Sequence, residues 1–570
     1  MKRYSSIDFL RGLAIFIMLF LHIISHVLDV DSLMANRNNE PLINIVALVA
    51  LPYLGGLAGF FLMVSAIGNM ISMSKYLKKD NSPDNLIVRQ VVGGFLLLIF
   101  AMLTEGVIGY WGSLGHLFRN LDNPADANWR GMLYHGYHFE TIHTIAWCII
   151  VNGLVQGLLV KIFKNNLRKI ILSYVFLSII VVALTPVLWS GASYIAALDG
   201  NAGYPFGVNP VTGVDRHTPY LTKSPWYDFI LYFFLNPIAG RPEPIFPYLA
   251  TSFVGSIIGL YISQDKKSIR WKFLKKIMIL AFITFWVGTV GIILNIVAIM
   301  ENAGFDQAID VYRMIWDHRY WVPENGVPYA GWLFQFLSLN GFAACGILIV
   351  IRLVEFRGFG AGFAKKSRFI RRFGFIAFTN YAYQWYFYIV WFIVSSIVAS
   401  PYANLNWGLT WLVLLLSLLL YHVIMLLWEK IKYTGTLEWC MATISAYILP
   451  KKMRKRSLEG KRWWQIGQLD VDSAFYNAEW LNIVEKEEID TENYSDSKLA
   501  MKLALIGLIT VLFIPLTIIS LVVAINSKKT EKNNKYNKVA LILSIIGVCL
   551  FSIGLVATLI LTPSMVGFAL

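Results

Sequence analysis

Long apolar segments separated by short polar stretches dominate this chain from residue 7 to residue 428. Each is close to the ~20 residues with which an α-helix, rising ~1.5 Å per residue, crosses a ~30 Å hydrocarbon layer. The segments lie near residues 7–28, 43–73, 86–108, 139–160, 170–188, 245–263, 277–299, 330–351, 374–398 and 408–428. The pattern predicts an all-α fold, a polytopic transmembrane helical bundle of about ten core spans.

The chain changes character after residue 430. Residues 435–449 predict a short amphipathic helix on the membrane surface, which is followed by a basic run and then by an acidic patch. Two further apolar segments, about 499–525 and 538–562, predict a C-terminal two-helix hairpin. We therefore expect three parts: a transmembrane core (1–430), an interfacial helix with a polar linker (431–497) and the hairpin (498–570).

Lysine and arginine are concentrated in every second loop of the core. The net charge is +15, yet 57% of the residues are hydrophobic and the mean hydropathy is +0.59. Retention of basic loops in the cytoplasm explains this charge better than nucleic-acid binding does. We expect a multi-pass protein of the cell membrane, in contact with lipids, with its N-terminus in the cytoplasm. Counting the predicted spans from a cytoplasmic N-terminus places the basic loop 528–538 outside, where the rule that basic loops stay in the cytoplasm does not expect it.

The four cysteines lie singly in apolar segments, at Cys148, Cys345, Cys440 and Cys549. Their spacing is typical of neither a disulfide framework nor a zinc site. We expect no metal.

The first apolar segment carries four ionisable residues, Asp8, Arg11, His22 and His26. Such residues are costly in a spanning helix and usually face a protein interior or a watery cavity. At ~100° per residue, Arg11 and His22 lie within about 20° of one helix face and roughly 16 Å apart along it. Asp8 and Arg11 are close enough in sequence to pair. The pattern predicts a polar stripe along this helix.

Three stretches resemble a known family. Residues 7–14, IDFLRGLA, with His22 downstream, resemble the first core helix of the O-acyltransferase branch of integral-membrane acyltransferases. Residues 373–381, FGFIAFTNY, and 435–439, GTLEW, are similar to two motifs of the YeiB-like branch, which is related to the heparan-alpha-glucosaminide N-acetyltransferases and usually has Asn in place of the histidine. The resemblance covers about residues 5–447. It implies acyl transfer from cytoplasmic acyl-CoA, with acetyl-CoA expected, to an extracytoplasmic glycan or glycolipid.

His22 is the candidate catalytic base, because an imidazole that titrates near neutrality can take a proton from an attacking hydroxyl or amine. The alternative is a polar residue satisfied by a neighbouring helix. Arg11, with Asp8, is the candidate donor-binding group, since a guanidinium suits bidentate contact with phosphate. The alternative is an anchor that fixes the register of the helix.

Other polar residues are candidates for the wall of a substrate pocket. Glu140 and His143 share a helix face, where a carboxylate can orient a histidine, but the spacing supplies too few ligands for a metal. For His26 the alternative is a solvated position near the outer interface, and for Asn380 it is a contact between helices. The candidate set is His26, Glu140, His143, Arg241, Glu243, Asn380 and Gln384.

The leading interpretation is therefore a membrane acyltransferase. A transporter or lipid-handling protein would use the same polar cavity without acyl transfer. In a third interpretation, the C-terminal hairpin and the acidic segment form a docking module for cell-envelope partners. A homo-oligomer is compatible with each of them.

Overall fold

The structure is a computed structural model that describes most of the chain. It covers residues 3–29, 32, 57–79, 81–127, 131–137, 139–164, 166–197, 226–240, 243–303, 331–454, 458–485, 494–509, 514–531 and 534–561. Within these ranges the regular structure is helical, with two isolated β-bridges and no strand. Nine helical segments of the described chain are long and apolar enough to cross a membrane. The prediction of an all-α, multi-pass membrane protein is confirmed.

The helices of the core follow the predicted spans closely, although the start of the span predicted at 43–73 lies outside the described residues. They are α1 (Ser5–Val27), α4 (Leu57–Leu77), α5 (Pro83–Leu103), α6 (Ser113–Arg119), α7 (Thr141–Phe163), α8 (Leu167–Ala197), α9 (Trp226–Ala239), α10 (Ile245–Ile262), α11 (Trp271–Ala303), α13 (Gly331–Glu355), α14 (Gly360–Lys366), α15 (Arg368–Phe375), α16 (Ala377–Ala382), α17 (Tyr386–Val398) and α18 (Trp407–Lys430). Side-chain caps fix several helix starts: Ser82 accepts from the Asn85 amide, and Asn406 accepts from the Leu409 amide.

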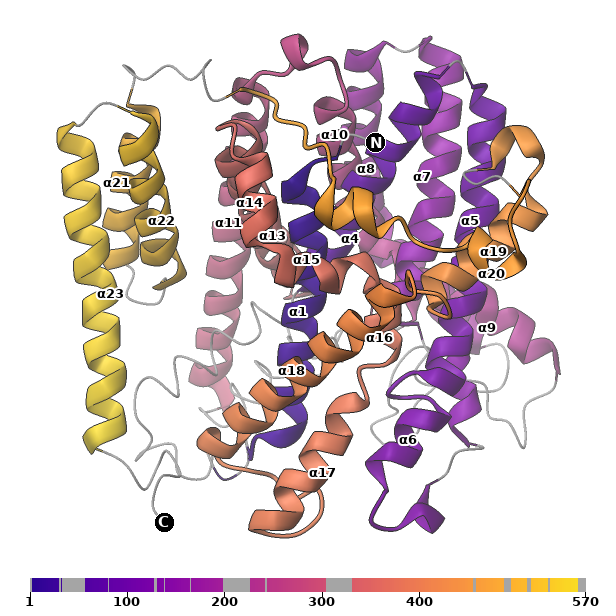
Figure 1. The fold of residues 1–570 in the computed structure, drawn as a ribbon. Helices are drawn as coiled ribbons and strands as arrows, with labels where there is room; N and C mark the ends of the chain where they lie inside the picture. The colour runs from indigo at the N-terminus through magenta and orange to yellow at the C-terminus, as the bar shows by residue number, and fades with distance from the viewer. Residues whose placement is uncertain are drawn as a thin grey trace.

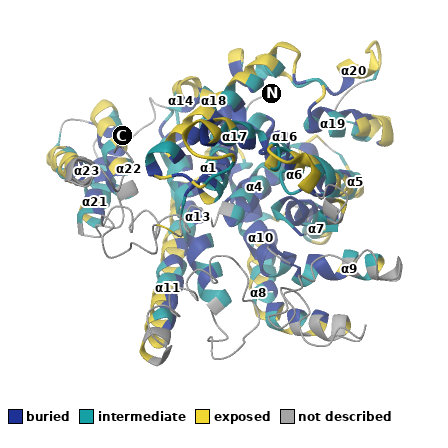
Figure 2. Ribbon diagram, turned by 90° about the horizontal axis from the view of Figure 1, so that it is seen from below, coloured by how far each residue is buried: buried dark blue, intermediate teal, exposed yellow. Residues whose placement is uncertain are grey.

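Helix α1 lies near the centre of the core, where α4, α13, α15 and α18 pack against it (Figures 1 and 2). The crossing with α15 is close because two glycines meet there. A methyl group at Gly12 would overlap the carbonyl oxygen of Ile370, and Gly374 lies against the backbone of Gly12. Small residues permit such backbone contact between membrane helices.

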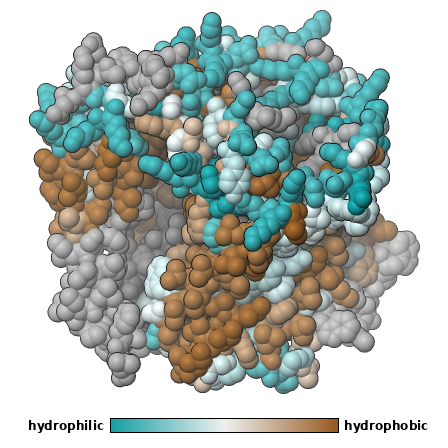
Figure 3. All heavy atoms as spheres, in the orientation of Figure 1, coloured by the Kyte–Doolittle hydropathy of each residue, from teal (hydrophilic) through white to brown (hydrophobic). Residues whose placement is uncertain are grey.

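The outer helices expose apolar side chains. Phe176 of α8, Leu280 of α11 and Leu415 of α18 are 63%, 61% and 66% exposed. On the face shown in Figure 3, hydrophilic residues gather at the end that carries the N-terminus and hydrophobic residues cover much of the rest. An apolar surface of this kind is expected where helices face lipid.

Two segments of the core are interrupted at the same place. The span predicted at 374–398 consists of the end of α15 followed by α16 and α17, with a break at residues 383–385. Helix α5 ends in a π-helical turn, Thr104–Ile108, before α6. The two interruptions touch, since the Trp385 indole donates to the Ile108 carbonyl over 2.8 Å and its ring stacks on Phe118. Interruptions at membrane depth are tolerated where protein or a cavity surrounds them.

Beyond the core, α19 (Leu437–Ile448) packs against α5 and α16, and α20 (Trp463–Ile466) packs against α19, at the side of the bundle (Figure 1). We call the described residues 450–454 and 458–485 the strap. The strap is bound to the start of the chain: the Arg3 amide donates to the Glu479 carbonyl over 3.0 Å, and the Leu481 amide donates to the Arg3 carbonyl over 2.8 Å. The predicted polar linker is therefore ordered against the core along these residues.

The C-terminal part is a group of three helices beside the core: α21 (Ser495–Ile509), α22 (Ile514–Thr530) and α23 (Lys535–Leu561) (Figures 1 and 2). The single span predicted at 499–525 is therefore wrong. The start of α21 meets the end of α22, because the amides of Asp496 and Ser497 donate to the Glu531 carboxylate over 2.8 and 3.1 Å. The two helices return the chain to the side where it began, so Lys528 and Lys535 lie at the same end of the module as Ser495. If residue 495 lies in the cytoplasm, as the basic loops predict, the loop 528–538 lies there too, in agreement with the charge rule.

Candidate functional site

The imidazole of His22 meets the break between α16 and α17. Its Nδ1 lies 2.5 Å from Oε1 of Gln384. The hydroxyl of Tyr421 in α18 donates to the backbone carbonyl of Gln384 and holds the break from the other side. In the tautomer in which Nδ1 donates to this oxygen, Nε2 is the nitrogen left to accept a proton. The site thus unites two of the predicted residues, His22 and Gln384, in a geometry suited to a base.

Aromatic rings enclose the same end of α1. The ring of Tyr110 lies 5.1 Å from the His22 ring. One turn further, His26 stacks on Phe387 at 5.7 Å and makes an edge contact with Tyr388 at 5.9 Å. The predicted pocket residue His26 is therefore part of an aromatic wall beside His22.

A buried carboxylate that was not among the predicted residues lies in this region. Glu105, in the π-helical turn, is 2% exposed and accepts a hydrogen bond of 2.7 Å from the Tyr381 hydroxyl. Tyr110 is within electrostatic range of both Glu105 and Glu140, and His22 is within range of Glu140. The sequence signal was a single carboxylate at the end of an apolar span, which is a functional candidate by default.

The other predicted acidic and imidazole residues gather at the start of α7. Glu140 is the N-cap residue of α7, and the buried His143 ring lies 5.6 Å from Phe139. Glu243 is also buried, and its backbone carbonyl accepts a hydrogen bond from Thr144. Burial raises the pKa of Glu243 to about 8, so this carboxyl group holds a proton at neutral pH. Among the described residues, no group of three or more His, Cys, Asp or Glu side chains could hold a metal ion.

Two predicted pocket residues remain, Arg241 and Asn380. Arg241 lies outside the described residues. The Asn380 amide donates to the Phe373 carbonyl over 3.0 Å and contacts the sulfur of Met425, so it joins α16 to α15 and α18. These contacts favour the interpretation of Asn380 as a contact between helices over its interpretation as a pocket-wall residue.

The two stretches that resemble family motifs, 373–381 and 435–439, are joined by hydrogen bonds between α16 and α19. The Glu438 carboxylate accepts from the amides of Phe378 and Thr379 over 2.7 and 3.3 Å and from the Thr379 hydroxyl over 2.5 Å. These amides belong to the first turn of α16, where orphan donors and the helix dipole favour an anion. Glu438 thereby fixes the short helix that leads to Gln384.

At the N-terminal end of α1 lies a cavity of about 850 Å³, within the range of ligand pockets. Among the residues that the structure describes, seven lysines and arginines and two carboxylates line it, a difference of five formal positive charges. These charged residues are Arg3, Asp8, Arg11, Lys75, Lys79, Arg89, Lys452, Arg454 and Asp470. The cavity supplies the charge that an anionic ligand needs, and we call it the basic cavity.

The predicted ion pair between Asp8 and Arg11 is replaced by others. Asp8 lies 3.0 Å from Arg3 and 3.9 Å from Arg371, which approach it from the preceding residues and from α15. Arg11 lines the basic cavity instead. His22 is not among the residues that line this cavity, and the rise of an α-helix separates it from Arg11 by roughly 16 Å along α1.

No family model, no curated protein and no solved structure matches this chain.

Proposed function

We propose that this protein is a membrane acyltransferase that moves an acyl group, with acetyl as the expected group, from cytoplasmic acyl-CoA to an extracytoplasmic glycan or lipid-linked sugar. The observation that supports it best is the arrangement on α1, where His22 meets a broken helix and Arg11 lines the basic cavity. The family resemblance supplies the reaction.

The donor side of the proposal uses the basic cavity. Phosphate groups of the donor would contact Arg11 and the other cations, because charge-assisted hydrogen bonds to guanidinium are short and directional. The end that carries the N-terminus then lies in the cytoplasm, as the basic loops predict. The thioester arm of the donor would extend along α1 toward His22.

The chemical step uses His22 as a base. Nε2 takes the proton of the acceptor hydroxyl or amine while its oxygen or nitrogen attacks the thioester carbonyl carbon. The tetrahedral intermediate collapses, the carbon–sulfur bond breaks, and the imidazolium returns the proton to the departing thiolate. Gln384 positions His22, because its oxygen keeps the proton on Nδ1. General base catalysis of this kind contributes roughly 10²–10⁴-fold to rate.

A carrier is the second candidate, and the interrupted helices favour it. Broken helices that meet at membrane depth form the substrate sites of many transporters. In that case His22 and Glu105 would bind substrate or couple its movement to protons.

Proteoliposomes incubated with acetyl-CoA labelled in the acetyl group distinguish the two candidates. Label that appears on the protein or on an added glycolipid acceptor supports the transferase. Labelled acetyl-CoA that enters the lumen intact supports the carrier and contradicts acyl transfer. Empty liposomes give the background.

A further inference from the structure

The basic cavity is built from two parts of the chain that are far apart in sequence. The core contributes Arg3, Arg11 and Arg89, among others. The strap contributes Lys452, Arg454, Asp470 and Ser473. The C-terminal side of the chain is therefore part of the wall of the cavity.

Cations outnumber carboxylates among the described residues that line this cavity. Asp8 is already shared by Arg3 and Arg371. Asp470 accepts a hydrogen bond of 3.1 Å from the Ser473 amide, and hydrogen bonds from Ser473 hold the pKa of Asp470 below its usual value. With both carboxylates ionised, the described lining residues carry five more formal positive charges than negative ones. Like charges that share a cavity repel one another, and an anion with more than one charge relieves this repulsion.

One wall of the cavity is formed by an arginine stacked on an aromatic ring. The guanidinium of Arg89 lies 4.7 Å from the centre of the Tyr76 ring, a cation–π contact that exposes a planar surface. Tyr76 is 9% exposed, and its buried hydroxyl has no hydrogen-bond partner among the described residues.

The strap is held in place independently of the cavity. The Ile483 amide donates to the Glu355 carbonyl over 2.8 Å, and the Arg371 guanidinium lies 4.3 Å from the centre of the Trp480 ring. Arg454 donates through Nε to the Leu449 carbonyl over 2.7 Å, which fixes the start of its guanidinium and leaves the terminal nitrogens for a ligand. The bond to Leu449 thus fixes Arg454 relative to the end of α19 before any ligand binds.

We propose that the strap completes a binding site for a ligand with two or more phosphate groups, which the core cations and the strap residues Lys452 and Arg454 hold together. The inference deepens the proposed function and rests on it for the identity of the ligand as coenzyme A. The proposed contacts involve only the phosphate groups of the ligand. A two-phosphate lipid headgroup carries the same chemistry, so the experiment includes one.

The test compares purified full-length protein with the double variant Lys452→Gln/Arg454→Gln. Lys461→Gln is the matched control, because Lys461 is an exposed strap lysine that does not line the cavity. The probes are coenzyme A, inorganic tripolyphosphate, and nanodiscs of phosphatidylcholine with or without cardiolipin. Size-exclusion profiles and thermal midpoints check folding, and Arg454→Lys tests whether a conserved charge keeps affinity.

We expect the Kd for coenzyme A and for tripolyphosphate to rise about tenfold or more in the double variant, since the loss of even one charge-assisted contact costs about that factor. Lys461→Gln and Arg454→Lys should bind like the wild type within about threefold. Strap-dependent binding of tripolyphosphate without binding of coenzyme A would keep the site and contradict the proposed donor. Strap-dependent binding of cardiolipin nanodiscs alone would assign the phosphates to a lipid. Equal affinities in the double variant and the wild type would overturn the inference, as would a wild type that binds none of the probes.

Discussion

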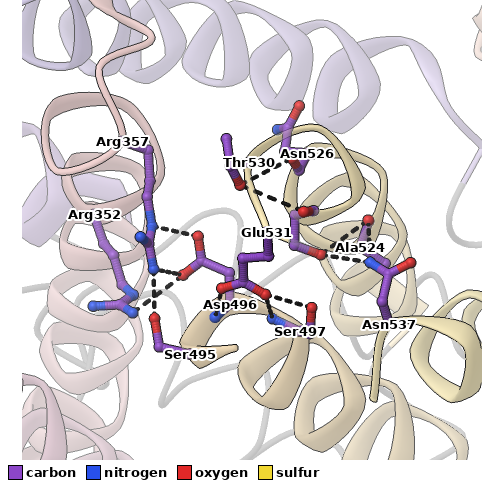
Figure 4. A network of polar contacts seen from close by, with 11 residues as sticks. Arg352, Arg357, Ser495, Asp496, Ser497, Ala524, Asn526, Thr530, Glu531 and Asn537 are labelled. Atoms are coloured by element: carbon purple, nitrogen blue, oxygen red, sulfur yellow. Dashed lines mark hydrogen bonds and ion pairs between the residues drawn. The ribbon is translucent and has the colours of Figure 1, made fainter. Parts of the chain in front are cut away.

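Asp496→Asn should release the three C-terminal helices from the core. The Asp496 side chain is 5% exposed and lies between two arginines of the core (Figure 4). Oδ1 is 3.1 Å from Arg352, and the carboxylate also pairs with Arg357. The two arginines are themselves only 11% and 9% exposed. Among the described residues, Asp496 thus pairs with both of these nearly buried cations at the junction.

The expected loss of docking free energy follows from the burial of these three side chains. Removing one partner of a buried ion pair costs about 3–5 kcal/mol, because an uncompensated charge is left behind. Asparagine keeps the shape but not the charge, and the contact between Arg357 and Ser495, 2.6 Å long, is retained. We expect a loss near the lower end, about 3 kcal/mol, or a factor of roughly 150 in the docking equilibrium.

The matched control is Glu459→Gln. Glu459 pairs with Lys451 over 2.7 Å, but the side chains are 76% and 83% exposed. An exposed pair contributes about 0–1 kcal/mol, so this variant should leave docking unchanged.

The assay is the distance distribution between spin labels on Cys549 of α23 and on a Lys365→Cys variant of α14, both exposed, with the other cysteines replaced. The parent protein and the Glu459→Gln variant should give one narrow distribution, and Asp496→Asn should give a broad one. A distribution for Asp496→Asn as narrow as that of the parent would refute the reasoning and show that apolar contacts hold the module.

Three further predictions follow from the hydrogen bonds and the topology. Glu438→Gln should lower the stability of the core by about 1–3 kcal/mol in thermal unfolding, because the first turn of α16 loses a charged acceptor; an unchanged midpoint would contradict this. Gln384→Leu should lower kcat of acyl transfer about tenfold with little change in the donor KM, since only the orientation of His22 is lost; a change confined to KM would count against it. A cysteine at Lys535 should react with an impermeant thiol reagent from the same side of the membrane as a cysteine at Lys365, and labelling from opposite sides would contradict the fold of the C-terminal helices.

Hydropathy found the continuous spans and missed the interruptions. The averaging that makes a span visible conceals a break of three residues, and the break at 383–385 contains only Tyr383, Gln384 and Trp385, which are compatible with a helix. At the C-terminus a signal was present: Pro515 is the second residue of α22, and proline is favoured in the first turn of a helix. Tertiary contacts determine the break at 383–385, whereas Pro515 in the local sequence indicates the start of α22.

The candidate site could also be predicted only in part, because local spacing reveals the residues of one helix but not their partners. Helical spacing on α1 placed Arg11 and His22 on one stripe, and the structure gives each of them a polar surrounding. The partners come from distant segments, so spacing could not identify them. Asp8 pairs with Arg3, just before the helix, and more distantly with Arg371 of α15, rather than with its helix neighbour Arg11. The strap cations of the basic cavity lie more than 400 residues beyond Arg11 in sequence.

The most direct test of the account is the rate of acyl transfer by His22→Ala in the proteoliposome assay. Ser25→Ala is the control, since Ser25 is exposed on the same helix and donates only to the backbone carbonyl of His22. We predict a rate about 10²–10⁴-fold below wild type for His22→Ala, with the normal elution profile and midpoint, and a near-normal rate for Ser25→Ala. A folded His22→Ala protein that transfers acyl groups within about twofold of the wild-type rate would contradict the assignment of His22 as the base.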